Sequence, residues 1–154
     1  MTFGSIIALA VPTNRTIHGP KLIMSASTLT VEYDYEGDTG SLKWVKILFE
    51  ETLVFEFRDS ACCRSDDLIG STEIRCQARS NYLKSVILKW QESVGWQDWQ
   101  QEKGGAERFK HFTIYFDDSA SLNVVASACR VDADPTSSGA CGSESDGDTR
   151  LNIK

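Results

Sequence analysis

The sequence predicts an α+β domain in which an antiparallel sheet of about five to six strands packs against one main amphipathic helix. Several segments alternate apolar and polar residues with a period of two, which is typical of half-buried strands. One segment carries apolar residues at helical spacing. The expected strands follow one another through connections short enough for hairpins, which favours antiparallel pairing over parallel crossovers.

The chain of 154 residues is long enough for one domain with a single core. We expect residues 1–24 to be a weakly patterned N-terminal extension, because Pro12 and a turn at residues 18–20 interrupt them. Residues 25–131 are expected to form the α+β domain. Residues 132–154 are rich in Gly, Ser and Asp. We expect a disordered acidic tail there, because so few apolar side chains cannot offset the entropy of ordering.

A hairpin is expected in the first half of the domain. In residues 28–36 the alternate apolar side chains are Leu29, Val31, Tyr33 and Tyr35. Turn residues 37–40 follow, and residues 42–59 are expected to form one long strand or two short ones. Glu50 and Glu51 mark a bulge or a change of direction in that second segment. Two strands around a connection that contains glycine indicate a hairpin.

A helix is expected in the middle of the chain. Residues 59–72 are expected to be an irregular connection and residues 73–79 a short strand, after which Ser80 offers an N-cap hydroxyl. The positions spaced i, i+3, i+4 and i+7 after this cap are Leu83, Val86, Ile87 and Trp90. They predict one apolar helix face that runs to about Ser93. Residues 95–108 are expected to form a helix remnant followed by a mobile loop.

The closing segment at residues 110–131, KHFTIYFDDSASLNVVASACRV, predicts two strands and a turn. Alternation places one set of side chains toward the core, namely Phe112, Ile114 and Phe116, and the other toward solvent, namely His111, Thr113, Tyr115 and Asp117. Asp117 and Asp118 lie where the first strand ends, and aspartate is a common turn residue. About 20 Å separates the Cα atoms of His111 and Asp117 on an extended strand, so the two cannot share a proton or an ion.

A small hydrolase that uses His111 with Asp117 or Asp118 therefore stays as an alternative that needs a third polar group in the same pocket. Residues 59–72 could supply that group. Cys62 and Cys63 lie in this segment, and a thiol nucleophile or a metal loop is conceivable there. Incidental thiols in a surface loop are the commoner case.

Charge and motif content exclude several function classes. The net charge is −6, so the chain has no attraction for phosphate backbones, and we expect no nucleic acid partner but favour a basic protein. The HExxH, CxxC, GxGxxG, GxSxG and P-loop patterns are absent from the sequence, so we expect no metal and no cofactor. We expect no membrane partner, because no apolar run reaches spanning length. Five cysteines without a paired framework indicate reduced thiols in a cytoplasmic protein.

Aromatic residues near the helix are candidates for partner binding. Trp96 and Trp99 follow the helix among polar residues, where full burial is not expected, and tryptophan is frequent in binding hot spots. Tyr82 joins them from the start of the helix. The acidic pair Asp66 and Asp67 would complement a basic partner. In the alternative interpretation, both tryptophan rings cap the open end of the sheet.

The closing hairpin also carries a family resemblance. An H-[YF]-x-[IL]-Y-F-D-D…V-x-A pattern is matched at His111, Phe112, Ile114, Tyr115, Phe116, Asp117, Asp118, Val124 and Ala126. On these residues, and on KILFEETLVFEFRD upstream, the chain resembles a family of small uncharacterised bacterial α+β proteins over about residues 27–131. It departs from the pattern at Ala120, where a glycine is usual. The resemblance implies a place among immunity or interaction proteins of bacterial toxin systems and transfers no catalytic residue.

We therefore expect a non-enzymatic protein-binding module, most specifically an immunity-type inhibitor of a bacterial toxin, with a basic toxin domain as its partner. The hydrolase described above is one alternative. A binder of a small apolar ligand on the face of the sheet is another. That alternative needs a pocket lined by Phe55, Phe57, Phe112 and Phe116.

Overall fold

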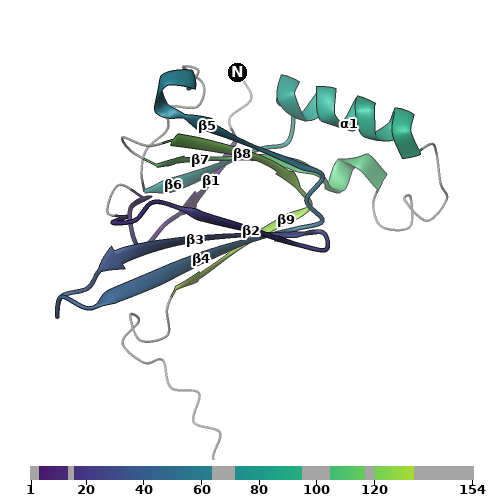
Figure 1. The fold of residues 1–154 in the computed structure, drawn as a ribbon. Helices are drawn as coiled ribbons and strands as arrows, with labels where there is room; N and C mark the ends of the chain where they lie inside the picture. The colour runs from purple at the N-terminus through teal and green to yellow at the C-terminus, as the bar shows by residue number, and fades with distance from the viewer. Residues whose placement is uncertain (1–3, 14–15, 64–71, 95–104, 117–119, 134–154) are drawn as a thin grey trace, which may run out of the picture.

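The computed structural model describes residues 4–13, 16–63, 72–94, 105–116 and 120–133 (Figure 1). Within these ranges, nine strands form two antiparallel sheets that face each other, and one α-helix lies outside this pair. No helix in the described part of the chain is long and apolar enough to cross a membrane. The expected antiparallel sheet with one helix is confirmed, but the strands divide between two sheets and are more numerous than expected.

The five-stranded sheet, called sheet A, has the strand order β1-β6-β7-β8-β5. Its strands are β1 (Ser5–Ala8), β6 (Glu73–Gln77), β7 (Lys110–Phe116), β8 (Ala120–Ala126) and β5 (Val54–Asp59). The four-stranded sheet, called sheet B, has the order β2-β3-β4-β9. Its strands are β2 (Lys21–Ser25), β3 (Thr28–Glu36), β4 (Leu42–Glu50) and β9 (Ala128–Ala133). Short 3-10 turns, η2 (Ser60–Cys62) and η4 (Gly105–Arg108), follow β5 and precede β7.

Two strands lie in the segment that we expected to be an N-terminal extension. β1 pairs with β6 in sheet A, and β2 pairs with β3 in sheet B. Both are short edge strands with mostly exposed side chains, so they lack the alternation that identifies a half-buried strand. One edge strand of each sheet thus lies wholly or almost wholly before residue 25. Of the expected tail, residues 134–154 lie outside the described part of the chain.

The two sheets are joined at a corner where two strands change sheet. β4 leads into β5 through Glu51, whose φ of 49° turns the backbone sharply, so the expected change of direction is confirmed. β8 leads into β9 through Ser127, so the chain also passes from sheet A to sheet B there. Hydrogen bonds tie the corner together, from Ser127 N to Glu50 O at 2.9 Å and from Leu53 N to Val125 O at 2.9 Å. The two sheets therefore meet on the side of the molecule where β4 leads into β5 and β8 leads into β9 (Figure 1).

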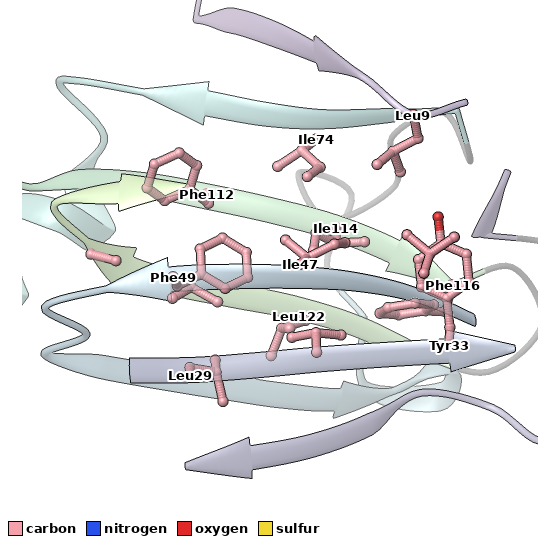
Figure 2. Close-up of a cluster of buried hydrophobic side chains, with 14 of the residues drawn as sticks. Leu9, Leu29, Tyr33, Ile47, Phe49, Ile74, Phe112, Ile114, Phe116 and Leu122 are labelled. Carbon is pink, nitrogen blue, oxygen red and sulfur yellow. The ribbon is translucent and has the colours of Figure 1, made fainter. Parts of the chain in front are cut away.

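The main core fills the space between the sheets (Figure 2). The fully buried apolar residues of sheet B are Leu29, Val31, Tyr33, Val45, Ile47 and Phe49, and those of sheet A include Ile74, Ile114, Phe116, Leu122 and Val124. Aromatic pairs bridge the sheets, with ring centroids 6.0 Å apart for Tyr33 and Phe116 and 5.4 Å apart for Phe49 and Phe112. Each large apolar side chain buried here contributes about 1.5–3 kcal/mol. The predicted core faces of residues 28–36 and 110–131 are confirmed.

Helix α1 (Asn81–Val94) covers part of the outer face of sheet A, the face turned away from sheet B (Figure 1). Ser80 caps it as predicted, because its Oγ accepts a hydrogen bond from Leu83 N at 3.0 Å. The predicted apolar face packs on the sheet. It forms a second, smaller cluster with Leu53, Val54, Phe109 and Val125. The helix prediction is thus confirmed together with its N-cap.

Candidate functional site

The outer face of sheet A buries polar side chains beside the start of α1. His111 and Thr113 alternate with core residues on β7, and Asn123 lies opposite Thr113 on β8. We expected this face of β7 to meet solvent, but His111 is 6% exposed and Thr113 is fully buried. Tyr82 of α1 packs against the imidazole, with ring centroids 4.8 Å apart. The solvent prediction was wrong because the helix lies against this face.

The buried groups form a hydrogen-bonded chain. Nδ1 of His111 lies 2.8 Å from Ser80 Oγ, and its Nε2 lies 2.7 Å from Asn123 Oδ1. The Thr113 hydroxyl donates to the same amide oxygen at 3.0 Å. An amide oxygen only accepts, so Nε2 carries the proton, and in the neutral ring Nδ1 then accepts the Ser80 hydroxyl. The chain, called the His111 network, links the first turn of α1 to β7 and β8.

A serine, an imidazole and an amide in this order could suggest a nucleophile with its base. Ser80 Oγ, however, already accepts the Leu83 N–H as the helix cap. The imidazole is almost entirely buried, and none of Ser80, His111 or Asn123 lines the groove described next. The arrangement fits a network that positions α1 on the sheet.

A groove of about 450 Å³ lies between α1 and β5. Its lining comprises Leu53, Val54 and Glu56 near and on β5, and Tyr82, Ser85, Val86, Lys89, Trp90 and Ser93 on α1. The helical residues form one stripe because positions three and four apart lie on the same side of a helix. Apolar side chains therefore form much of the groove, and Glu56 and Lys89 provide its charges. The volume lies within the range of about 300–1,000 Å³ that is usual for binding pockets.

β5 ends sheet A and carries exposed aromatic side chains. Phe55 is 37% exposed and Phe57 is 46% exposed, although both lie opposite buried residues of β8. On the other face of the strand, Arg58 binds Glu56 through Nε–Oε1 at 2.8 Å and Nη2–Oε2 at 3.0 Å. The strand thus combines an apolar face with a paired acid and base.

A second polar centre lies on the outer face of sheet B. The buried carboxylate of Asp34 on β3 accepts hydrogen bonds from Ile17 N and His18 N, both at 3.0 Å, and from Thr16 Oγ1 at 3.1 Å. The other carboxylate oxygen pairs with Nδ1 of His18. Burial raises the pKa of Asp34, but the hydrogen bonds from His18, Ile17 and Thr16 outweigh it and lower the pKa to about 2. This centre, called the Asp34 nest, holds residues 16–18 on sheet B.

The described cysteines do not gather into a site. Cys62 is exposed, Cys63 is partly exposed, Cys76 is buried, and all are free thiols. Burial, together with the neighbouring Cys76, raises the pKa of Cys129 to about 12, so this thiol is unreactive near neutral pH. In the described part of the chain, no three His, Cys, Asp or Glu side chains are arranged to hold a metal ion.

The structure describes some of the predicted site residues. Tyr82 lines the groove, and His111 lies in the network beneath it. The other candidates, namely Trp96, Trp99, Asp66, Asp67, Asp117 and Asp118, lie outside the described residues. Of the four phenylalanines expected around a ligand pocket, Phe112 and Phe116 are core residues and the two on β5 are exposed; none lines the groove.

Sequence reasoning missed the partners of His111. Asn123 carried a usable signal, because an amide in the middle of a strand of small and apolar residues must find a partner when the strand is buried. Glu56 and Lys89 were missed because the groove depends on how α1 sits over β5. Comparison with known protein families, with curated proteins and with solved structures gives no significant match for this chain.

Proposed function

We propose that this protein is a non-enzymatic protein-binding module that holds a segment of a partner protein in the groove between α1 and β5. The observation that carries the proposal is the groove itself, which offers about 450 Å³ beside Val54, Val86 and Trp90. Anchoring side chains of a partner are held in such apolar pockets, and aromatic residues dominate the binding energy. Tyr82 and Trp90 provide the aromatic surface.

The partner segment that fits best carries an apolar anchor flanked by basic residues. Charge complementarity supports this choice, because the net charge of the chain is −6. Within the groove, the Glu56 carboxylate is 43% exposed and can meet a cation of the partner, while Arg58 holds it in place. Lys89 on the helical side of the groove would disfavour a second basic residue there, which would fix the direction of the segment.

The specific form that we propose is an immunity-type inhibitor of a bacterial toxin with a basic toxin domain. Acidity and the family resemblance of the closing hairpin support it. The engagement of His111 by Ser80 and Asn123, away from the groove, favours binding over hydrolysis. A small hydrolase would instead need the imidazole to reach a bound substrate.

The first test fills the groove without disturbing the core. Ser85 is exposed and lines the groove, so Ser85→Trp should occupy it and weaken partner binding by about tenfold or more. Leu88→Trp is the matched control, because Leu88 is an exposed residue of α1 that does not line the groove. A basic protein captured from a bacterial lysate by the wild type would be purified and titrated against both variants by calorimetry.

The expected result is near wild-type affinity for Leu88→Trp and a loss for Ser85→Trp. Equal affinity of the two variants would remove the groove from the binding surface. Ester or amide turnover by the wild type that His111→Ala abolishes would replace the binding function with the hydrolase, provided that the variant stays folded.

A further inference from the structure

The edge of sheet A at β5 has the composition of a self-pairing strand. β8 pairs with β5 on one side, and within the described part of the chain no strand pairs with its other side. An unpaired strand edge is a template for another strand. Phe55 and Phe57 lie opposite the buried Val124 and Leu122, yet both remain substantially exposed. Another strand beside β5 would cover them.

The sequence of β5, VFEFRD, pairs opposite charges when it meets itself in the antiparallel register described next. With a two-fold axis at Phe57, Phe57 faces Phe57 of the second copy. Glu56 then faces Arg58 of the second copy, and Arg58 faces its Glu56. Residues directly opposite on antiparallel strands share a face of the sheet, so these side chains meet.

The neighbouring registers are disfavoured by like charges. An axis at Glu56 would place two carboxylates opposite each other, and an axis at Arg58 would place two guanidinium groups opposite each other. Like charges directly opposite are destabilising, whereas aromatic pairs and opposite charges stabilise. The charges of β5 therefore favour the register centred on Phe57 over these two.

The ion pair within one chain is compatible with this pairing. Arg58 already holds both carboxylate oxygens of its own Glu56, at 2.8 and 3.0 Å. A carboxylate has about four acceptor sites, so Glu56 can accept a second guanidinium beside that of its own Arg58. Glu56, 43% exposed, has room for the second contact.

We propose that two copies of this chain associate through β5 in the register centred on Phe57, so that the two copies of sheet A form one continuous sheet. A two-fold interface of this kind is isologous and closes on itself. The pairing uses the edge of β5, whereas the proposed partner groove opens on the outer face between β5 and α1; Glu56 belongs to both surfaces. The inference does not depend on the proposed partner, because dimerisation is measured on this chain alone.

Charge-reversal variants test the register. Glu56→Arg and Arg58→Glu each place like charges opposite each other, and each variant alone should dimerise at least about tenfold more weakly than the wild type. An equimolar mixture of the two variants restores opposite charges at every position and should form a heterodimer. The chain with both substitutions should form a homodimer of near wild-type affinity. Sedimentation velocity and native mass spectrometry would measure these species.

Each outcome decides the proposal. A wild type that stays monomeric at millimolar concentration overturns it, as do single variants that dimerise like the wild type. Single variants that are monomeric alone and also fail to pair in the mixture overturn the register. The mixture also controls for misfolding, because a misfolded chain would not regain pairing from a complementary partner.

Disulfide cross-linking checks the same axis independently. In a background where Cys62, Cys63 and Cys141 are replaced by Ser, Phe57→Cys places two thiols directly opposite each other, near the upper limit of the Cβ separation in a disulfide. Phe55→Cys is the matched control, because Phe55 faces Asp59 of the second copy in this register. Mild oxidation should cross-link Phe57→Cys and leave Phe55→Cys monomeric in a denaturing gel. The reverse pattern would place the axis elsewhere and overturn the register.

Discussion

Each outer face of the sandwich buries one polar centre, and the two centres hold segments by different means. On sheet A, the His111 network connects side chains from three separate elements, namely the cap of α1, β7 and β8. On sheet B, the Asp34 nest binds two backbone N–H groups and two side chains of one short segment, residues 16–18. The first centre joins side chains of separate elements, and the second is a single carboxylate that holds one local segment.

The difference shows what each centre specifies. Burying an apolar face stabilises a helix on a sheet but leaves its rotation and translation loosely defined, whereas hydrogen bonds between side chains fix one position. The His111 network fixes where α1 starts, and hence where the groove lies between α1 and β5. The Asp34 nest has no such reach, because its partners lie within three consecutive residues. Mutations in the two centres should therefore differ in what they disturb.

The largest expected effect is the loss of Asn123. Asn123→Ala leaves His111 Nε2 and the Thr113 hydroxyl without the acceptor that both share. A buried donor without an acceptor costs about 1–3 kcal/mol, so the free energy of unfolding should fall by about 3 kcal/mol. Urea denaturation followed by circular dichroism would measure it. Asn81→Ala, at an exposed position of α1, should change it by less than about 0.5 kcal/mol.

An apolar replacement of the whole network sharpens this result. A triple variant with His111→Phe, Thr113→Val and Asn123→Leu removes donors and acceptors together, so most of the lost stability should return. The start of α1 should nevertheless lose its anchor, and hydrogen exchange at the Leu83 amide should become faster than in the wild type. An amide exchange rate that stays unchanged would mean that apolar packing alone positions the helix.

Neither centre could be predicted from the sequence, although the core could. Phe112, Ile114 and Phe116 follow the period of a strand, and periodicity is a local property of the chain. The contact between Ser80 and His111 joins residues 31 positions apart, and that between His111 and Asn123 joins residues 12 apart. Such pairings depend on strand register and on the position of the helix on the sheet, and no local sequence pattern encodes either of them.

The division into two sheets was equally hidden from local patterns. Glu50 and Glu51 indicated a change of direction, but a bend does not say whether the chain stays in the same sheet. β1 has four residues and β2 has five, mostly exposed at sheet edges, so neither shows clear alternation. The strands at 28–36 and 110–116 were predictable because both bury alternate residues in the core.

The next largest effect is the acid sensitivity of the Asp34 nest. The pKa of Asp34 lies at about 2 in the folded protein, below its ordinary value of 3.8. Because the pKa of Asp34 is lower in the folded protein than in the unfolded chain, the ionised carboxylate stabilises the fold at a pH above 3.8. This stabilisation is lost as the pH falls toward the pKa of the folded protein, so the free energy of unfolding should decrease by about 2 kcal/mol between pH 4 and pH 2. Asp34→Asn should remove this part of the pH dependence. The free energy of unfolding would be measured from unfolding curves at several pH values. If the Asp34 nest contributed nothing, this free energy would fall in parallel in the wild type and in Asp34→Asn as the pH decreases.

The smallest effect is expected from the exposed side of the same nest. The His18 side chain is 66% exposed, so its pairing with Asp34 is weakened by solvent, while the N–H groups of Ile17 and His18 bind the carboxylate from the backbone. His18→Ala should therefore cost less than about 1 kcal/mol and leave the pKa of Asp34 below its ordinary value. A carbon-detected NMR titration of the Asp34 carboxyl would measure that pKa. Its return to 3.8 in the variant would show that the imidazole, and not the backbone, keeps Asp34 ionised, and the two centres would then both depend on a histidine side chain.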